Sequence, residues 1–234
     1  MHLTKLHVKI TPVKQETVND NIIEGPKLQI RDCGLCRYQE ILDLQLELHD
    51  ERKNDRIPDT VIIVEHPDVI TLGARQSANK LYVSRDELAN KNIDVVEVRR
   101  GGGTTAHNRG QLVFYPIMNL KKMSLGINEY IRALEVIGQE LLMEFDLASD
   151  LRKGYPGLWV EERKIASIGV RVSRYVTYHG MAINIQNDLS IFDYIEPCGL
   201  KNIVMTSLAK ETGKEYSMSL VKQKLTEILI RHFS

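Results

Sequence analysis

Apolar residues recur at helical spacing in three segments of the chain, and each segment predicts an amphipathic helix. The clearest covers residues 127–145, with Ser124 or Asn128 as a candidate cap at its start. A second lies near the C-terminus, from Leu220 to Leu229. The third covers residues 35–53, and its expected apolar stripe is Leu35, Tyr38, Leu42 and Leu46, widened by Ile41, Leu44 and Leu48.

Short runs rich in β-branched and aromatic residues predict strands between these helices. The runs are residues 60–65, 69–72, 95–99, 112–118, 158–161, 165–172 and 177–185. Helices scattered among groups of adjacent strands indicate a mixed β-sheet packed with helices, an α/β or α+β domain. The pattern does not encode the order of the strands.

The length of 234 residues fits one large domain with a substantial core. Residues 11–27 are polar and contain Pro12, Gly25 and Pro26, so we expect a loosely structured lead-in over residues 1–27. A single catalytic domain is then expected over residues 28–234.

Composition narrows the class of protein further. Lys plus Arg equals Asp plus Glu at 31 each, so no global field favours nucleic acid or membrane, and any acidic partner must bind a local patch. The N-terminus lacks the apolar core of a signal peptide, and no apolar run approaches the roughly 20 residues of a membrane span. Three cysteines argue against a disulfide framework and favour a reducing, cytoplasmic location.

Cys198 is the first candidate for chemistry, since it lies between Pro197 and Gly199. These neighbours interrupt regular structure and favour a bend that presents the thiol and leaves backbone N–H groups to stabilise an oxyanion. A solitary cysteine is, however, commonly a small buried hydrophobe.

Lys164 is the second candidate, because it stands immediately before an apolar strand. There it could be partly desolvated and coupled to a neighbouring thiolate. The alternative is an ordinary solvated lysine at a strand end, following Glu161, Glu162 and Arg163.

The run Arg99-Arg100-Gly101-Gly102-Gly103-Thr104-Thr105 lets the backbone approach a ligand closely and offers arginines to phosphate or carboxylate. It matches neither a P-loop nor a dinucleotide fingerprint, and a tight turn with surface arginines explains it equally well. His107 and His179 each lie beside turn residues. Each of them is either a ligand contact or a polar residue at the end of a strand. Cys33 and Cys36 lack a second ligand pair at zinc spacing, so we expect no metal site.

Taken together, these segments resemble the lipoyl(octanoyl) transferase family, from about Leu35 to Leu229. The resemblance rests on the order and spacing of modest motifs. They are His66-Pro67-Asp68-Val69-Ile70-Thr71-Leu72-Gly73, the run from Arg99 to His107, Lys164-Ile165-Ala166-Ser167-Ile168-Gly169-Val170-Arg171-Val172, Tyr178-His179-Gly180-Met181-Ala182-Ile183-Asn184, Pro197-Cys198-Gly199-Leu200 and Met205-Thr206-Ser207-Leu208.

The resemblance implies a biotin/lipoate protein ligase-like fold and transfer of octanoyl from octanoyl-acyl carrier protein to a lysine of lipoyl domains. The implied acceptors are 2-oxoacid dehydrogenase E2 subunits and the glycine cleavage H protein, with no cofactor, nucleic acid or membrane. The family's nucleophile maps onto Cys198 and its partner lysine onto Lys164. The implied substrate-binding residues are Arg100, Gly101, Gly102, Gly103, Thr104, Thr105, Ala106, His107, Ser167, Ile168, Gly169, His179, Gly180, Met181 and Ala182.

The chain departs from the family in one place. The family usually reads Tyr-His-Gly-Pro-Gly-Gln where this chain has Ala106-His107-Asn108-Arg109-Gly110-Gln111. The difference bears on the acyl pocket and on chain-length preference more than on reaction type. Arg99, Arg100 or Arg109 are expected to meet an acidic carrier or its phosphopantetheine phosphate.

Three other activities are compatible with the same sequence. They are an ATP-dependent lipoate or biotin ligase, which needs no nucleophilic cysteine, a non-catalytic acyl- or carrier-binding module, and a thioester hydrolase. Cys198 and Lys164 occurring together favour the transferase over the binding module.

Overall fold

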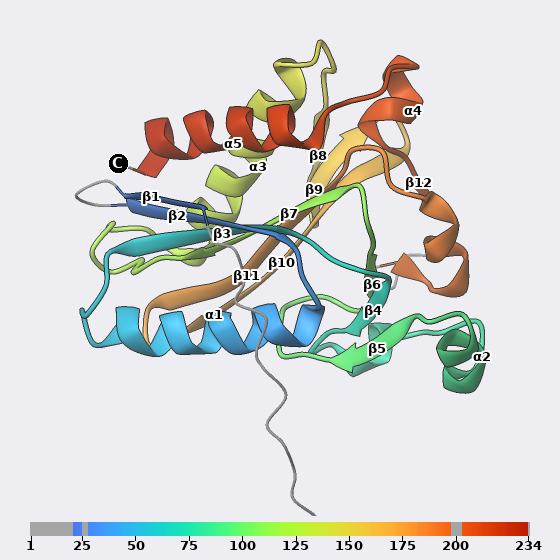
Figure 1. Cartoon of the computed structure of the whole chain (residues 1–234), viewed down its shortest axis with the longest axis horizontal. Coiled ribbons are helices and arrows are strands. Elements are labelled where there is room, and N and C mark those ends of the chain that lie inside the picture. The colour runs from blue at the N-terminus through green and yellow to red at the C-terminus, as the bar shows by residue number, and fades with distance from the viewer. Residues whose placement is uncertain (1–20, 25–27, 198–202, 234) are drawn as a thin grey trace, which may run out of the picture.

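The computed structural model describes residues 21–24, 28–197 and 203–233, and these form a mixed α/β structure. Figure 1 shows the main sheet running through the middle, with α3 and α5 on one face and α1 on the other. Along the chain the elements are β1 (Asn21–Glu24), β2 (Leu28–Leu35), α1 (Tyr38–Lys53), β3 (Asp59–Glu65), β4 (Val69–Leu72), η1 (Gln76–Ala78), α2 (Arg85–Asn90), β5 (Asp94–Glu97), β6 (Thr105–His107), β7 (Gln111–Ile117), α3 (Ile127–Met143), β8 (Asp150–Arg152), β9 (Tyr155–Val160), β10 (Arg163–Ser173), β11 (Val176–Asn184), η2 (Leu189–Tyr194), β12 (Val204–Met205), α4 (Leu208–Thr212) and α5 (Met218–Phe233).

Among the described residues, the main sheet has nine strands in the order β1-β2-β3-β7-β11-β10-β9-β8, with β12 paired to β10. The β2–β3 and β10–β12 pairs are parallel and the others are antiparallel, so the sheet is mixed, as predicted. A second sheet has the order β5-β4-β6. The fold class predicted from the sequence is confirmed.

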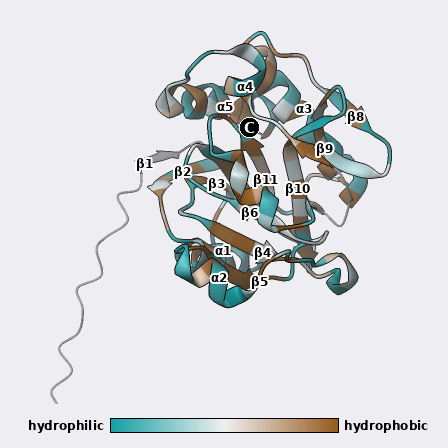
Figure 2. Cartoon of the chain, turned by 90° about the vertical axis from the view of Figure 1, so that its right-hand side faces the viewer, coloured by the Kyte–Doolittle hydropathy of each residue, from teal (hydrophilic) through white to brown (hydrophobic). Residues whose placement is uncertain are grey.

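The main sheet is buried on both faces, and its central strands carry apolar residues on each of them. In β3, Val61 and Ile63 pack in the cluster of α3 and α5, whereas Ile62 and Val64 pack in the cluster of α1. This division follows from the alternation of side chains along a strand. Figure 2 shows β10 and β11 as largely hydrophobic strands inside this layered arrangement.

The buried face of α1 differs from the predicted stripe by about one position. Tyr38, Ile41, Gln45, Leu48 and Arg52 are buried in α1, whereas the predicted stripe members Leu35 and Leu46 are exposed. The error arises because Gln45 and Arg52 are polar, so a count of apolar residues cannot assign them to the core.

The structure differs from the sequence-based prediction at the N-terminal lead-in and at the start of α3. Within the polar segment expected to be loosely structured, residues 21–24 instead form β1, paired antiparallel with β2. Helix α3 begins where predicted, but its N-cap is Gly126 with no side-chain cap, so neither Ser124 nor Asn128 has that role.

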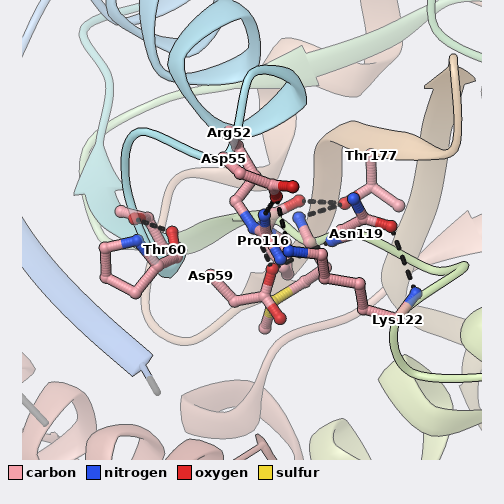
Figure 3. A network of polar contacts seen from close by, with 10 residues as sticks. Arg52, Asp55, Asp59, Thr60, Pro116, Asn119, Lys122 and Thr177 are labelled. Atoms are coloured by element: carbon pink, nitrogen blue, oxygen red, sulfur yellow. Dashed lines mark hydrogen bonds and ion pairs between the residues drawn. The ribbon is translucent and has the colours of Figure 1, made fainter. Parts of the chain in front are cut away.

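A polar network anchors the C-terminal end of α1 to the main sheet (Figure 3). The Nε atom of buried Arg52 donates to Asp59 at 2.6 Å, and its Nη1 atom donates to Asp55 at 2.6 Å. Asp59 also accepts from the backbone N–H of Asn119 at 2.9 Å, which ties the chain after β7 to the start of β3. The network fixes α1, which supplies Tyr38 and Gln45 to the interior.

Replacing Asp59 with Ala should lower the free energy of unfolding by about 3 kcal/mol, because Arg52 would keep a buried charge without its main partner. Chemical denaturation measures this loss. The matched control is Lys122→Ala, which removes an exposed ion pair with Asp55 and should cost about 1 kcal/mol or less. Equal losses in the two variants would contradict the proposed role of Asp59.

Within the described ranges, no helix combines the length and apolar character needed to cross a bilayer.

Candidate active site

Two neighbouring hollows lie on either side of a contact between β10 and the glycine run. The first, here called the histidine cavity, measures about 30 Å³ and is lined by His107, His179, Tyr38 and Tyr115 among others. The second, here called the lysine groove, measures about 360 Å³ and contains Lys164. Both are lined by Gly101, Gly102, Ile168 and Gly169, which therefore form the wall between them.

The histidine cavity gathers most of the residues that the sequence predicts to bind substrate. Those that line it are Arg100, Gly101, Gly102, Thr105, His107, Ser167, Ile168, Gly169, His179, Gly180, Met181 and Ala182. Gly103, Thr104 and Ala106 line neither hollow. Ala106 packs in the cluster of β4 and α2, and Thr104 accepts from the backbone N–H of Lys80.

The side chain of Arg100 bonds the glycine run to β4 and does not extend into solvent. Its Nη1 atom donates to the carbonyl of Gly103 at 2.8 Å, and its Nη2 atom donates to the Thr71 carbonyl at 2.8 Å and hydroxyl at 2.7 Å. These bonds hold the loop in which Gly102 adopts a φ of +83°, a conformation that favours glycine. Arg100 is buried, so its expected contact with a carrier protein is wrong.

Three buried histidines lie close together at the cavity, and His107 and His179 line it. The rings of His66 and His107 meet edge to face with their centroids 5.7 Å apart, and burial lowers the pKa of His66 to about 4. Burial, followed by the neighbouring His66, lowers the pKa of His107 well below its ordinary value. Burial, followed by Arg100, lowers the pKa of His179 to about 3. All three imidazoles are therefore neutral at pH 7.

His179 differs from the other two because neither ring nitrogen has a hydrogen-bond partner among the described residues. Its φ of +57° is unusual for a residue with a side chain, and its backbone N–H donates to Gln45 of α1 at 2.8 Å instead of to a neighbouring strand. A buried imidazole without a partner leaves a position for a water molecule or for a polar atom of a ligand.

Lys164 is only 2% exposed, in contrast to a solvated lysine at a strand end. Its Nζ atom donates to the carbonyl of Pro156 at 3.2 Å and lies 5.3 Å from the centre of the Trp159 ring. Both partners belong to β9, the strand paired with β10 at this position. The pairing therefore holds the ammonium group inside the apolar groove.

A chain of hydrogen bonds connects the histidine cavity with Lys164. The Nδ1 atom of His107 contacts Gln111 at 2.7 Å, and the Gln111 amide donates to Asn184 at 2.9 Å. Asn184 donates to the carbonyl of Thr206, whose own N–H donates to the carbonyl of Lys164, each at 2.9 Å. The motif residues after the glycine run and at the end of β11 thus fix the backbone beside Lys164.

Cys198 lies outside the described residues, but the chain is described on both sides of it. Before it, Glu196 pairs with Lys80 at 2.8 Å, next to the glycine run. After it, β12 pairs in parallel with β10, and Met205 lies opposite Lys164. The described residues before this gap therefore lie near the glycine run, and those after it lie beside Lys164.

Sequence motifs did not reveal several residues that line the two hollows. Tyr38, Val113 and Tyr115 line the histidine cavity, and Arg75, Ile127, Ile131, Tyr155 and Pro156 line the lysine groove. They come from helices and strands far apart in the sequence, so only the fold brings them together. In the described part of the chain, no group of three or more His, Cys, Asp or Glu side chains is arranged to hold a metal ion.

The buried histidines should make stability depend on pH below about 6.5. An unfolded histidine binds a proton near that pH, whereas folded His66 does so only near pH 4, so unfolding takes up protons and stability falls as pH falls. Denaturation between pH 6.5 and 5, above most carboxyl titrations, measures the slope. Replacing His66 with Gln should reduce the mean slope over this interval by about 1 kcal/mol per pH unit. An unchanged slope would show that His66 is protonated in the folded protein.

The family match and the most similar curated proteins agree on one family. Residues 37–230 match the lipoyl protein ligase A/B catalytic domain. The octanoyltransferase of Syntrophobacter fumaroxidans is 41% identical over 207 residues, covering 88% of this chain and 91% of that protein. The octanoyltransferase of Desulfovibrio desulfuricans is 40% identical over 197 residues, covering 84% of this chain and 83% of that protein.

Solved structures support the fold at lower sequence identity. Lipoate-protein ligase A bound with ATP superposes with a TM-score of 0.65 at 14% identity, covering 90% of this chain and 85% of that one. The lipoate protein ligase of an archaeal lipoylation system from Thermoplasma acidophilum has a TM-score of 0.63 at 13% identity, covering 88% and 82%. The chain therefore belongs to the lipoyl protein ligase A/B catalytic domain family and, by its similarity to octanoyltransferases, is an acyltransferase.

Proposed function

We propose that this acyltransferase moves an octanoyl group from an acyl carrier thioester to a lysine of a lipoyl domain, through a thioester on Cys198. The observation that carries the proposal is the buried ammonium group of Lys164 in an apolar groove, beside the strand that follows Cys198. The relatives named octanoyltransferase support the acyl group and the reaction class.

In the first step the Cys198 thiolate attacks the carbonyl carbon of the donor thioester, and the carrier thiolate leaves. A free thiol has a pKa of about 8.5, so little thiolate exists at neutral pH without a nearby positive charge. The ammonium group of Lys164 supplies that charge in surroundings where water screens it weakly. Exchange of one thioester for another needs no nucleotide.

In the second step the acceptor amine attacks the Cys198 thioester, and the Cys198 thiolate leaves as the amide forms. The attacking nitrogen must lose a proton, and Lys164 takes it after giving its own to the departed carrier thiolate. Lys164 thus serves both steps.

The acyl chain fits best with its carbonyl end in the lysine groove and its tail directed past Ile168 and Gly169. The histidine cavity, at about 30 Å³, has room for about two water molecules and must widen to admit a chain. Each methylene removed from water contributes about 0.8 kcal/mol to binding. The glycines of the shared wall leave room for the tail between the two hollows.

The acceptors we propose are the lipoyl domains of 2-oxoacid dehydrogenase E2 subunits and the glycine cleavage H protein. The ligase from Thermoplasma acidophilum was solved as part of a system with its E2 lipoyl domain, and it shares this fold.

The acyl-enzyme can be tested by intact mass. After mixing with octanoyl carrier protein and no nucleotide, the wild-type chain should gain one octanoyl group, and Cys198→Ser should gain none at neutral pH. Cys33→Ser is the matched control and should be acylated normally. Turnover that requires ATP, or acylation of Cys198→Ser as fast as wild type, would reject the mechanism.

Lys164→Arg tests the second role of the lysine, since arginine keeps the charge but cannot act as a base. We expect Cys198 still to be acylated, while transfer to the lipoyl domain slows by about 10²- to 10⁴-fold. Single-turnover mixing separates the two rates. Full turnover in Lys164→Arg would refute Lys164 as the base.

Gly157→Ala tests the placement of Lys164. Gly157 has a φ of +128°, and an added Cβ would lie 3.0 Å from Cε of Lys164 and 2.2 Å from the carbonyl oxygen of Ala166. We expect kcat to fall by about tenfold or more because a displaced ammonium group no longer meets the thiolate. Gly213→Ala is the control, since its φ is +71° and no atom lies within 4 Å of the new Cβ. Equal losses of kcat in the two variants would show that backbone strain alone causes the effect.

A further inference from the structure

A single peptide group joins a carboxylate of α3 to the ammonium group of Lys164. The N–H of Gly157 donates to Oε1 of Glu135 at 3.3 Å, and the carbonyl of Pro156 accepts from Nζ of Lys164 at 3.2 Å. This N–H and this carbonyl belong to the same peptide bond, between Pro156 and Gly157. The bond is trans, so the two groups are coplanar and point in opposite directions. Glu135 and Lys164 therefore bond to the two ends of one planar group.

Glu135 is an exception on the buried side of α3. Among the buried residues of this helix, which the structure describes over its whole length, it alone carries a charge. It follows Ile127 and Ile131 at intervals of four residues, so the three side chains lie on one face of the helix. The two isoleucines line the lysine groove, whereas Glu135 lines neither hollow. A buried carboxylate is costly unless its oxygens are bonded, and Oε1 has its partner in β9.

The other oxygen of this carboxylate faces an arginine of the same helix. Nη1 of Arg132 lies 3.5 Å from Oε2 of Glu135, and the Arg132 side chain is largely exposed. An exposed partner of this kind contributes little to stability, but it gives the carboxylate a second contact and so restricts its orientation. Oε1 is thereby left for the N–H of Gly157.

The strand pairing leaves the orientation of this peptide group weakly fixed. The register between β9 and β10 shifts by one residue between Lys164 and Ala166, which is an irregularity of the bulge type. Gly157 has a φ of +128°, and glycine is the residue whose backbone rotates most freely. A hydrogen bond from outside the two strands is therefore needed to hold the peptide plane, and Glu135 supplies it.

We propose that Glu135 is a positioning residue for Lys164. Its carboxylate holds the N–H of Gly157, the planarity of the peptide fixes the carbonyl of Pro156, and this carbonyl holds the ammonium group where the Cys198 thiolate forms. The inference rests on the proposed function, which gives the position of that ammonium group its importance. Because Glu135 lines neither hollow, its loss should lower the rate and leave donor binding unaltered.

The test compares Glu135→Met with Glu135→Gln. Methionine has a similar length and suits an apolar helix face but offers no oxygen to the N–H, whereas glutamine offers an oxygen without the charge. We expect Glu135→Met to slow acylation of Cys198 by octanoyl carrier protein about tenfold or more, with the KM for the donor within about twofold of wild type. Glu135→Gln should stay within about threefold of the wild-type rate. Single-turnover mixing followed by intact mass measures both.

Two controls separate positioning from a general effect on the fold. Glu140→Met makes the same change on α3, where Glu140 pairs with Arg231 and His232 of α5, and should leave acylation unaltered. In a Lys164→Ala background, adding Glu135→Met should slow the residual acylation by at most about twofold, because no ammonium group is left to position. Circular dichroism identifies any loss of fold, and Glu135→Leu repeats the test in a second variant that lacks the oxygen.

Four outcomes would overturn the inference. Acylation of Glu135→Met as fast as that of Glu140→Met would show that the bond to Gly157 is dispensable. Equal rates in Glu135→Gln and Glu135→Met would show that the charge matters and the bond does not. An equal loss with and without Lys164 would show an effect independent of the lysine, and a rise in the KM for the donor would place Glu135 in binding. Wild-type protein that forms no acyl-enzyme would instead refute the proposed function.

Discussion

The contact between the glycine run and β10 is the constraint on which both hollows depend. The backbone N–H of Gly101 donates to the carbonyl of Val170 at 2.9 Å, so the loop after β5 continues the main sheet where β9 has ended. A side chain on Gly73 or Gly103 would collide with backbone at less than 3 Å, and Arg100 occupies the remaining space. Because the approach is backbone to backbone, it joins the small sheet to the large one and divides the interior into a cavity and a groove.

The spacing of apolar residues predicted the helix that buries one face and the strands that are buried on both faces. The helix over residues 127–143 and the strands around β3, β7 and β11 were clear because most of their buried positions are apolar. The pattern missed β2, which contains Arg31 and Asp32. It also misplaced the buried face of α1, where Gln45 accepts from the backbone N–H of His179 and Arg52 donates to Asp59. Sequence periodicity records hydrophobicity, so a polar residue that is buried through a distant partner is assigned to the wrong face.

The candidate site was predictable where a motif is contiguous and unpredictable where the fold assembles it. The glycine run, β10 and β11 converge on one cavity, as the resemblance implied, yet Tyr38, Tyr115 and Ile127 gave no signal of their own. The arginines show the limit most clearly. Composition and motif suggested Arg100 for anion recognition, but its guanidinium donates to Thr71 and Gly103, whereas the adjacent Arg99 is exposed. Sequence position alone does not say which of two adjacent arginines faces water.

In the proposed mechanism one cation, Lys164, serves a thiol and then an amine. Removing a lysine from water is costly unless its charge is solvated by the protein, and here the Pro156 carbonyl and the Trp159 ring contribute to that solvation. Both partners are neutral, so they stabilise the ammonium group without cancelling its field, which low polarity around the groove keeps strong. These two described contacts of Lys164 thus suit both of the roles proposed for it.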